Sequence, residues 1–594
     1  MSDSEKMTAS ELEWGKICRA SLAKLISELS FEEVLKPVTK PEEDGAYHLL
    51  LSSGISYSFS AKVGIWGNLV VNGDSIRRTP DNDEPACPQQ FTIDARTEMG
   101  MSAATEATFL RELANTLRQD LVLLQRTKES AGEDILPLPA HERQSLLAGH
   151  PKAVANKGRL GWSIPDLEQY APEYHRSFKL LWIAAKRGSC KISESLDSNE
   201  TDTLTQSLGS AEFNRLHTVL HEQGLGLESH VLIPVHPWQW DHVIQQSHLV
   251  DIQRGNLIML GEFGDSYVSG PSLRTLVNID RPGSPDIKVA LTILNTSAYR
   301  GIPGKYIAKG GKLSLWLHDT VQADSFLKDK VLILQEQRGV WFEHSIYAQA
   351  PHAPYQHHES LGVIWRENVA KHLAEGQQAC LYAELLHEDT KGIPLAVYHA
   401  QKSGLSIEDW LTQLFKVTAA PLYHFLAKYG VGFIAHGQNI TVTMQNHVPV
   451  GIAIKDLQGD CAVVDQVFPE HSSLSQDLRD NLPQKPAHYI IHDIQTAHFA
   501  SLLRFFSAGL NRAGIIDEET FYAVLGSVLQ QYMAEHEALA ERFALFDLFT
   551  PTMAKVCINK VRFAVGYEDN AERPLPALGT DLHNPIYLTN KVLV

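Results

Sequence analysis

The pattern of apolar and polar positions predicts a chain that combines helices with short strands. Residues 10–29 begin with a capping-box pattern and then place an apolar residue at every third or fourth position, as in an amphipathic helix. Short alternating runs at 47–52, 57–62 and 67–71 predict a small antiparallel sheet. Residues 102–126 repeat leucines at helical spacing and predict a long helix.

Farther along the chain the same patterns predict a turn, two helices and two connections. The Asn-Gly pair at 72–73 favours a tight hairpin turn. Apolar residues at helical spacing predict long helices near 410–428 and 518–536. The stretches 190–212 and 464–485 are rich in Ser, Asp, Glu and Gln, and we expect them to be exposed connections. The predicted fold class is α+β with mixed sheets.

The length of 594 residues predicts several packed domains, because an average domain has roughly 150 residues. The first helix, the small sheet and the long helix after them form one unit that we expect to end near residue 145. We therefore predict an N-terminal domain at 1–145, a middle domain at 146–375 and a C-terminal domain at 376–594.

Composition and charge exclude several classes of protein. The apolar fraction of 44% and the charged fraction of 21% are those of an ordinary globular protein. A net charge of −18 disfavours nucleic acid as a partner. The six cysteines are scattered singly, the N-terminus lacks an apolar signal core, and no run of about 18 apolar residues occurs. We therefore expect a cytoplasmic protein without membrane insertion.

The standard catalytic motifs are missing from the sequence. It contains no GxxxxGK[ST] phosphate loop, no HExxH zinc motif and no GxSxG nucleophile elbow. Their absence disfavours a P-loop nucleotidase, a zinc protease of that type and an α/β-hydrolase. ATP use through another kind of site stays open.

A first polar cluster surrounds the apolar run 289–294, which predicts a buried strand with Lys288 and Arg300 at its two ends. Cations and hydroxyls in so short a region suit the oxygens of phosphates or carboxylates. On spacing alone, exposed salt bridges around a strand are an equally good interpretation. The cluster consists of Ser272, Arg274, Thr275, Lys288, Thr296, Ser297 and Arg300.

A second cluster accompanies a predicted hairpin at 440–454, with its turn at 445–447. Such a hairpin folds Asp456 back beside Gln438 and Asn439, so that an amide and a carboxylate converge. Protein kinases hold magnesium against ATP phosphates in a similar way. The alternative is a hairpin with polar ends and a core histidine at His436.

A third stretch, 149–162, combines glycines with His150, Lys157 and Arg159. Its cations would suit an anionic ligand or a clamp between domains. A solvated basic loop is the competing interpretation.

Many segments, in order from about 149 to 549, resemble the NRPS-independent siderophore synthetases, the IucA/IucC family. The similar segments are GHPKAVANKGRLGW, YAPEY, IPVHPWQW, GEFGD, SLRTLVN, LTILNTSAYRGIPGKYIA, LGVIWREN, AHGQNITV, KDLQGD, HDIQTAHF and RFALFDLF.

This resemblance implies a cupped hand in which 1–145 form a thumb, 146–375 the fingers and 376–594 a palm with kinase-like nucleotide-site elements. ATP would lie between fingers and palm together with Mg²⁺, and a homodimer would be the common state. Some relatives carry a Glu two residues before the histidine of AHGQN, where this chain has Ile434.

The resemblance also implies a role for each clustered residue. Arg300 and His436 would be catalytic, and Asp456 and Asn439 would bind the metal. His150, Lys157 and Arg159 would contact substrate. The residues implied to bind ATP are Ser272, Arg274, Thr275, Lys288, Thr296, Gln438 and Asn439.

The implied reaction forms an amide in two stages. A carboxylate first displaces pyrophosphate from ATP, and the amine of an N-hydroxylated lysine or diamine then displaces AMP. Ala153 and Val154 stand where a second His-Pro would mark the citrate-first subgroup, which favours the late-acting subgroup and a citryl monoamide donor, as in aerobactin biosynthesis. One alternative is a synthetase that cyclises succinyl-hydroxamate units into macrocyclic dihydroxamates. An alternative from another class is a small-molecule kinase, which releases ADP.

Overall fold

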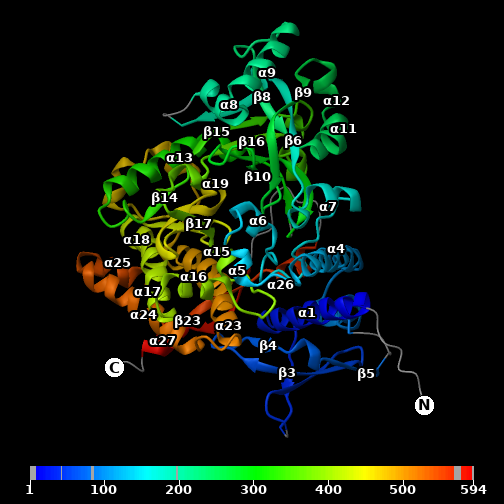
Figure 1. Cartoon of the computed structure of the whole chain (residues 1–594), viewed down its shortest axis with the longest axis vertical. Helices are drawn as coiled ribbons and strands as arrows, with labels where there is room; N and C mark the ends of the chain where they lie inside the picture. Colours follow the sequence, from blue (N-terminus) through cyan, green and yellow to red (C-terminus); the bar gives the residue numbers. More distant parts are fainter. Residues whose placement is uncertain are drawn as a thin grey trace.

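The chain folds as a mixed α+β protein with several sheets, which confirms the predicted fold class (Figure 1). No helix in the part that the structure covers is long and apolar enough to cross a membrane. Ser297 of the first predicted cluster lies outside the described residues. The computed structural model describes residues 9–41, 43–81, 86–195, 199–296, 298–566 and 577–590.

The N-terminal region packs helices α1 (Ala9–Phe31) and α4 (Ala103–Thr127) with a five-stranded antiparallel sheet. Both helices confirm the predictions for 10–29 and 102–126, and Ser102 caps α4 by accepting a hydrogen bond from the Thr105 N–H. The predicted strands are also present. The sheet contains β1 (Val38–Thr39), β2 (Ala46–Leu50), β3 (Ser56–Val63), β4 (Leu69–Val71) and β5 (Arg77–Thr79).

The hairpin turn predicted at 72–73 is wrong. The Asn72 side chain accepts a hydrogen bond from the Asp74 N–H at 3.1 Å and starts the short helix η1 (Gly73–Ser75). Strands β4 and β5 both pair with β3 rather than with each other. Side-chain capping by the asparagine therefore replaces the tight turn.

The middle region is built on an eight-stranded sheet in which every neighbouring pair is antiparallel. Helix α13 (Gly304–Ala323) packs against two of its strands, β7 and β15. In spatial order the strands are β7 (Cys190–Glu194), β15 (Glu336–Phe342), β16 (Gly362–Arg366), β11 (Asp286–Val289), β10 (Thr275–Asn278), β9 (Leu257–Ser269), β6 (Phe178–Lys186) and β8 (His230–Val235).

The exposed connection predicted at 190–212 is wrong. Strand β7 pairs with β15, and helices α8 (Glu200–Leu208) and α9 (Ser210–Glu222) follow. Leu204 and Leu208 of α8 are buried in the core of the large sheet. Two apolar anchors in a polar helix were enough to dock it, so composition alone misled the prediction.

The C-terminal region contains a four-stranded sheet, a three-stranded sheet and the largest hydrophobic core. The predicted helix at 518–536 is present as α24 (Glu518–Glu535). The helix predicted at 410–428 is two helices, α17 (Ile407–Val417) and α18 (Ala419–Tyr429), which meet at Thr418. The four-stranded sheet runs β14 (Val331–Ile333), β20 (Val448–Ile454), β19 (Ile440–Gln445), β17 (Gln377–Leu381), and the other runs β18 (Val431–Phe433), β21 (Cys461–Val464), β22 (Gln484–Lys485).

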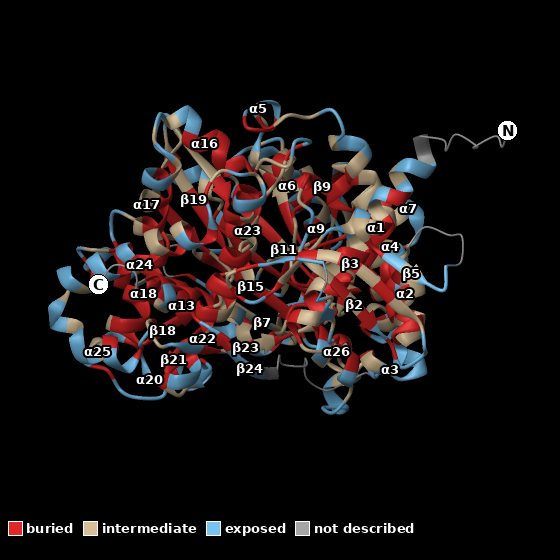
Figure 2. Ribbon diagram, turned by 90° about the horizontal axis from the view of Figure 1, so that it is seen from below, coloured by how far each residue is buried: buried red, intermediate tan, exposed pale blue. Residues whose placement is uncertain are grey.

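The stretch 464–485 contains only short elements: η7 (Pro469–Ser473), α20 (Gln476–Asn481) and β22. Figure 2 shows buried residues running through the interior, whereas exposed residues gather on outer segments such as α20 and α25 (Ala540–Leu545). The prediction that 464–485 form an exposed connection holds for most of this stretch, although the Leu478 side chain is buried.

Two segments link regions that are far apart in sequence. Residues from Leu313 to Ile333 belong to the C-terminal core, because β14 is a strand of its four-stranded sheet. Phe563 of α26 (Asn559–Val565) packs edge-on against Phe109 of the N-terminal region at 5.2 Å between ring centres. The domain boundaries at 145 and 375 stay a prediction.

Candidate active site

Five polar side chains lie on one face of the eight-stranded sheet. Thr275 is opposite Lys288, Asp286 is opposite Arg366, and Arg366 is in turn opposite Glu336. Residues directly opposite each other in antiparallel strands point to the same face, and so do residues two apart in one strand. The register therefore gathers two cations, two carboxyl groups and a hydroxyl across four adjacent strands.

Asp456 joins this row to the C-terminal hairpin. Its Oδ1 accepts hydrogen bonds from Lys288 Nζ at 2.6 Å and from Arg366 Nη1 at 2.8 Å. The hairpin predicted at 440–454 is confirmed as β19 and β20, and Asp456 follows it in a left-handed conformation with φ of 63°. In Figure 1, β15 and β16 lie next to the short helix α19 (Leu457–Asp460), which begins directly after Asp456, and Gln458 of α19 donates to Glu336 of β15. The two polar clusters therefore meet, although they are distant in sequence.

Asn439 lies at the other end of the hairpin, and its amide contacts a different carboxylate from the one predicted. The Lys455 N–H donates to the Asn439 carbonyl oxygen at 3.2 Å and keeps the two strand ends together. The Asn439 Nδ2 donates to Asp460 Oδ2 at 2.7 Å, not to Asp456. The Gln438 N–H donates to His436 Nδ1 at 3.2 Å. Asp460 is thus a second carboxylate beside Asn439.

The single strand predicted at 289–294 is wrong. Strand β11 ends at Val289, and β12 (Leu291–Asn295) forms a separate two-stranded sheet with β13 (Ala298–Arg300). Lys288 lies within β11, and Arg300 lies opposite Leu291 rather than at the end of the same strand. Both strands are buried, so the apolar run is continuous and periodicity cannot show the break.

Arg274 and Arg300 hold the two ends of the segment that runs from the end of β12 to the residue after β13. Arg274 donates to the carbonyl oxygen of Gly301, and Arg300 Nη2 donates to that of Asn295 at 2.5 Å. Thr296 lies in the same segment in a left-handed conformation with φ of 51°. These contacts place both guanidinium groups and the threonine hydroxyl in one neighbourhood.

Ser272 shapes the turn before β10. Its Oγ accepts a hydrogen bond from the Thr275 N–H at 3.2 Å, and Leu273 between them has a φ of 69°. The strain of that conformation is offset by burial of the Leu273 side chain, which is fully inaccessible. The turn thereby presents Arg274 and Thr275 next to Lys288.

The basic loop is buried, so its interpretation as a solvated loop is wrong. Lys157 Nζ contacts Asp120 Oδ1 at 2.6 Å. Arg159 makes a two-pronged ion pair with Glu173 at 2.6 and 2.7 Å, and both side chains are 4% exposed. The positive charges of Lys157 and Arg159 are therefore matched inside the protein, whereas His150 belongs to a different neighbourhood.

His150 lies in the electrostatic field of the predicted catalytic residues. Burial lowers its pKa to about 3, and the positive charges of His436, Lys24 and Arg300 contribute to the shift. The Lys24 Nζ also donates to the His150 carbonyl oxygen at 3.0 Å. Of the three loop residues, His150 is the one that the structure brings near His436 and Arg300.

The site carries buried positive charge. Burial lowers the pKa of Lys288, and the nearby Arg274 and Arg366 add to the effect, while Asp456 opposes it. Burial also lowers the pKa of Lys455 to about 8. Burial alone would raise the pKa of Asp456, but Lys288 and Arg366 hold it well below its ordinary value. Cations crowded together away from water favour the binding of an anion.

Burial raises the pKa of two further carboxyl groups in the site. Burial raises the pKa of Glu336 to about 7, and Gln458 donates a hydrogen bond to this carboxyl group. Burial raises the pKa of Asp460 and lowers that of His436, while their mutual attraction opposes both shifts. Such groups can change protonation when a charged ligand enters.

Magnesium fits the oxygen donors present in the site. Both ion pairs of Asp456 use Oδ1, so Oδ2 is the oxygen that could ligate a metal ion. The Asp460 carboxylate lies within hydrogen-bond distance of the Asn439 amide. Carboxylate and amide oxygens, completed by water and phosphate oxygens, are the ligands that Mg²⁺ prefers.

The motif-based assignment missed Arg366, Glu336, Lys455 and Asp460 as site residues. Arg366 ends the buried apolar strand β16, where a charged side chain is costly unless it is paired. Glu336 begins β15, which is buried but starts with polar residues. Lys455 and Asp460 lie close to Asp456 in sequence. A search for charges inside apolar strands would have found Arg366.

Comparison with known proteins gives consistent matches along the whole chain. Residues 138–387 match the model of the IucA / IucC family, and residues 408–571 match the model described as ferric iron reductase FhuF-like transporter. The aerobactin synthase of Escherichia coli is 41% identical to this chain over 582 residues, which are 98% of this chain and 99% of that protein.

Two solved structures have the same fold. The aerobactin synthetase IucC of Klebsiella pneumoniae superposes with a TM-score of 0.87 at 38% identity, covering 98% of this chain and 100% of that one. The ATP-bound aerobactin synthetase IucA of Klebsiella pneumoniae has a TM-score of 0.74 at 18% identity, covering 96% and 99%. The similarity therefore spans every region described above.

Proposed function

The chain belongs to the IucA/IucC family of siderophore synthetases, and we propose that it forms an amide between a citryl monoamide and the amine of an N-hydroxylated lysine, as in aerobactin biosynthesis. The family makes it an enzyme of siderophore biosynthesis with ligase activity. The observation that carries the proposed use of ATP is the pair of largely buried cations Lys288 and Arg366, which meet on Asp456.

In this proposal the cationic side chains of the site bind ATP, which is an anion. The triphosphate is held by Arg274 and Lys288, with hydroxyls from Ser272 and Thr275 as further donors. Arg366 positions the Asp456 carboxylate relative to the large sheet, because its guanidinium group pairs with both Asp286 and Asp456. The residues proposed to complete the ATP site are Thr296, Gln438 and Asn439.

We assign the metal to Asp456 and Asn439, with Asp460 as an added carboxylate. Bound Mg²⁺ would neutralise charge on the phosphate oxygens of ATP. Asp460 compensates in this chain for the hydrophobic Ile434, whose N–H donates to the Asp460 carbonyl oxygen at 2.8 Å. The ion would also relieve the repulsion among the carboxylates, which burial strengthens.

Arg300 and His436 are proposed to serve the first chemical stage. A carboxylate oxygen attacks the α-phosphorus of ATP, and the bond to pyrophosphate breaks. Arg300 pairs with the incoming carboxylate, and donors in the site stabilise the charge that develops on the phosphate oxygens. His150, which lies near both residues, is proposed to contact the substrate. Lys157 and Arg159 are proposed to support this contact by holding the loop that carries His150.

In the second stage the amine attacks the acyl carbon and AMP leaves. Only the neutral form of the amine, which has lost its extra proton, acts as the nucleophile. Burial lowers the pKa of His436. Its Nδ1 accepts the Gln438 N–H, so the neutral imidazole carries its hydrogen on Nε2 and can donate a hydrogen bond to charge that develops on the substrate.

Four further features belong to the same proposal. The three regions are thumb, fingers and palm of a cupped hand, with kinase-like elements around the β19–β20 hairpin. ATP lies between the eight-stranded sheet and this hairpin. The enzyme is a cytoplasmic homodimer. It acts on small molecules only.

The proposal is tested with substrate-dependent pyrophosphate release by the purified enzyme and its variants Arg300→Ala and His436→Ala. We expect each variant to lose more than about 100-fold in kcat with an unchanged melting temperature, because each role is a contact made in the transition state. Near-normal release by both variants would overturn the site assignment. Mass spectrometry of the products separates a linear citrate-based amide from a macrocyclic dihydroxamate.

A further inference from the structure

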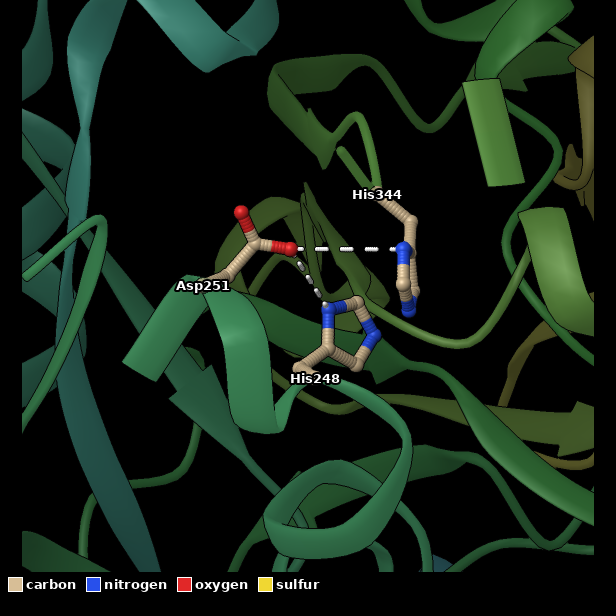
Figure 3. Close-up of side chains that lie close together, drawn as sticks. All are labelled: His248, Asp251 and His344. Atoms are coloured by element: carbon tan, nitrogen blue, oxygen red, sulfur yellow. Dashed lines mark ion pairs between the residues drawn. The ribbon is translucent and has the colours of Figure 1, made fainter. Parts of the chain in front are cut away.

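Two histidines and an aspartate meet at the end of strand β15 that is opposite to the candidate active site (Figure 3). His248 follows the short helix α11 (Gln245–Ser247), Asp251 lies in α12 (Leu249–Gln253), and His344 follows β15. Asp251 Oδ2 is 3.9 Å from His248 Nδ1 and 4.0 Å from His344 Nδ1. All three side chains are at most 3% exposed. Glu336 of the active site lies at the other end of β15.

The hydrogen bonds of both imidazoles are consistent with a hydrogen on each Nε2 atom. His344 Nε2 lies 2.8 Å from the Ser247 carbonyl oxygen, which can only accept, so this nitrogen carries the hydrogen. His248 Nε2 lies 3.0 Å from Ser360 Oγ, and that hydroxyl donates its own hydrogen to the His357 carbonyl oxygen at 3.4 Å. With the hydroxyl hydrogen placed toward His357, His248 Nε2 is the donor to Ser360 Oγ. Both Nδ1 atoms are left with a lone pair.

Three electron-rich atoms thus face one another in the protein interior. Figure 3 shows both Nδ1 atoms turned toward the same carboxylate oxygen of Asp251. Within the described residues, His248 Nδ1 has no hydrogen-bond partner. His344 Nδ1 receives the N–H groups of Ile346 and Tyr347 at 3.1 and 3.3 Å, which agrees with a lone pair at that atom. His344 Nδ1 and Asp251 Oδ2 have only these long backbone contacts and that of the Ser345 N–H, and a buried acceptor without any partner, such as His248 Nδ1, is costly unless a cation meets it.

We propose that His248, Asp251 and His344 form a structural zinc site. Two imidazole nitrogens and one carboxylate oxygen are typical ligands of Zn²⁺. Tetrahedral zinc holds its ligand atoms roughly 3.3 Å apart, so each nitrogen would move about 0.6 Å toward the carboxylate. His344 would exchange its two long contacts with backbone N–H groups for the bond to the metal.

Each proposed ligand is already oriented by a second hydrogen bond. The Ser247 carbonyl holds His344, the Ser360 hydroxyl holds His248, and Asn256 Nδ2 donates to Asp251 Oδ1 at 3.0 Å. Such supporting contacts are usual around metal ligands.

The fourth ligand can come from the same loop or from water. The Ser345 N–H lies 3.3 Å from Asp251 Oδ2, and its buried hydroxyl has no hydrogen-bond partner in the described part of the chain. Bound zinc would pin α11 and α12 to the end of β15. Its role is stability of the large sheet rather than chemistry on the substrate.

The test measures zinc in protein prepared without a metal-affinity tag. We expect one zinc per chain by mass spectrometry of the metal, or one equivalent taken up by chelator-treated protein in calorimetry, and a rise in Tm of roughly 2–5 °C on zinc addition. His248→Gln and Asp251→Asn should each abolish uptake and the rise in Tm. His242→Gln changes an exposed histidine on the preceding helical segment and should leave both unchanged.

Two results would overturn the zinc site. In the first, the wild-type protein takes up no stoichiometric zinc and its Tm is the same with zinc and with chelator. In the second, His248→Gln or Asp251→Asn binds as much zinc as the wild type. Because the wild-type measurement needs no variant, poor folding of a variant does not prevent a decision, and neither readout depends on the proposed reaction.

Discussion

Replacing Lys288 with Met removes one cation from the proposed triphosphate site while keeping a side chain of similar length. The Lys288 ammonium contacts Asp456 at 2.6 Å in the resting site, and Arg366 Nη1 contacts the same oxygen at 2.8 Å. Asp456 therefore keeps one cationic partner in the variant. We expect Lys288→Met to fold and to bind ATP poorly.

The size of the effect follows from the bond that is lost. A hydrogen bond to a charged group contributes about 1.5–3 kcal/mol in proteins. At 1.36 kcal/mol for each factor of ten, this corresponds to a fall in kcat/KM for ATP of roughly 10- to 150-fold. The fall should exceed tenfold, because the Lys288 side chain is only 15% exposed and a hydrogen bond is stronger in such surroundings than in water.

The assay is steady-state pyrophosphate release with ATP as the varied substrate. Lys555→Met is the matched control. Lys555 lies on strand β23 (Thr552–Cys557), in another sheet, and makes an ion pair with Glu33 of the same length, 2.6 Å. The control should keep normal kinetics. A kcat/KM for Lys288→Met within about threefold of the wild type would refute the triphosphate role of this row.

Three other substitutions test separate parts of the structure. Because the folded pKa of Glu336 is raised to about 7, its contribution to stability is complete below the unfolded pKa of 4.5 and is lost as the pH rises through 7. Glu336→Gln should therefore gain up to about 3 kcal/mol over the wild type between pH 5 and pH 8, and a constant difference in Tm across this range without nucleotide would contradict the shift. Arg159→Met leaves the Glu173 carboxylate buried without its partner and should lower the free energy of unfolding by about 3–5 kcal/mol. The second change Glu173→Gln should recover most of this loss in the double variant. Lost turnover of Arg159→Met with a normal Tm would instead favour a contact between Arg159 and the substrate. Tyr522→Phe deprives the Trp66 indole N–H of its acceptor at 2.6 Å and should lower stability by about 1–2 kcal/mol with unchanged kcat, and an unchanged Tm would mean that water replaces the bond.

Local patterns predicted the elements whose partners are close in sequence. The helices at 10–29 and 102–126 and the hairpin at 440–454 follow from periodicity and turn residues, which act within a few positions. The break at Ala290 could not be predicted in this way, because β11 and β12 are both buried and differ only in the sheet that each one joins. Helix α8 was missed because its docking depends on strands β9 and β15, which are distant in sequence.

The candidate site shows the same limit. Motifs named Lys288 and Asp456, but their contact requires the large sheet to face the hairpin across a sequence separation of 168 residues. Arg366 could be recognised as a site residue only from the strand register, which places it opposite Asp286 and Glu336. Arg159 carried a charge that suggested a ligand, and its partner Glu173 is apparent only in the fold.

The nucleotide product is the measurement that tests the central claim most directly. The purified enzyme is supplied with ATP, Mg²⁺, a citryl monoamide and an N-hydroxylated lysine, and nucleotide, pyrophosphate and amide are quantified together. Adenylation followed by amide formation predicts one AMP and one pyrophosphate for each amide formed, with no turnover when the carboxylate is omitted. Substrate-dependent ADP without pyrophosphate would contradict the account and identify a kinase instead.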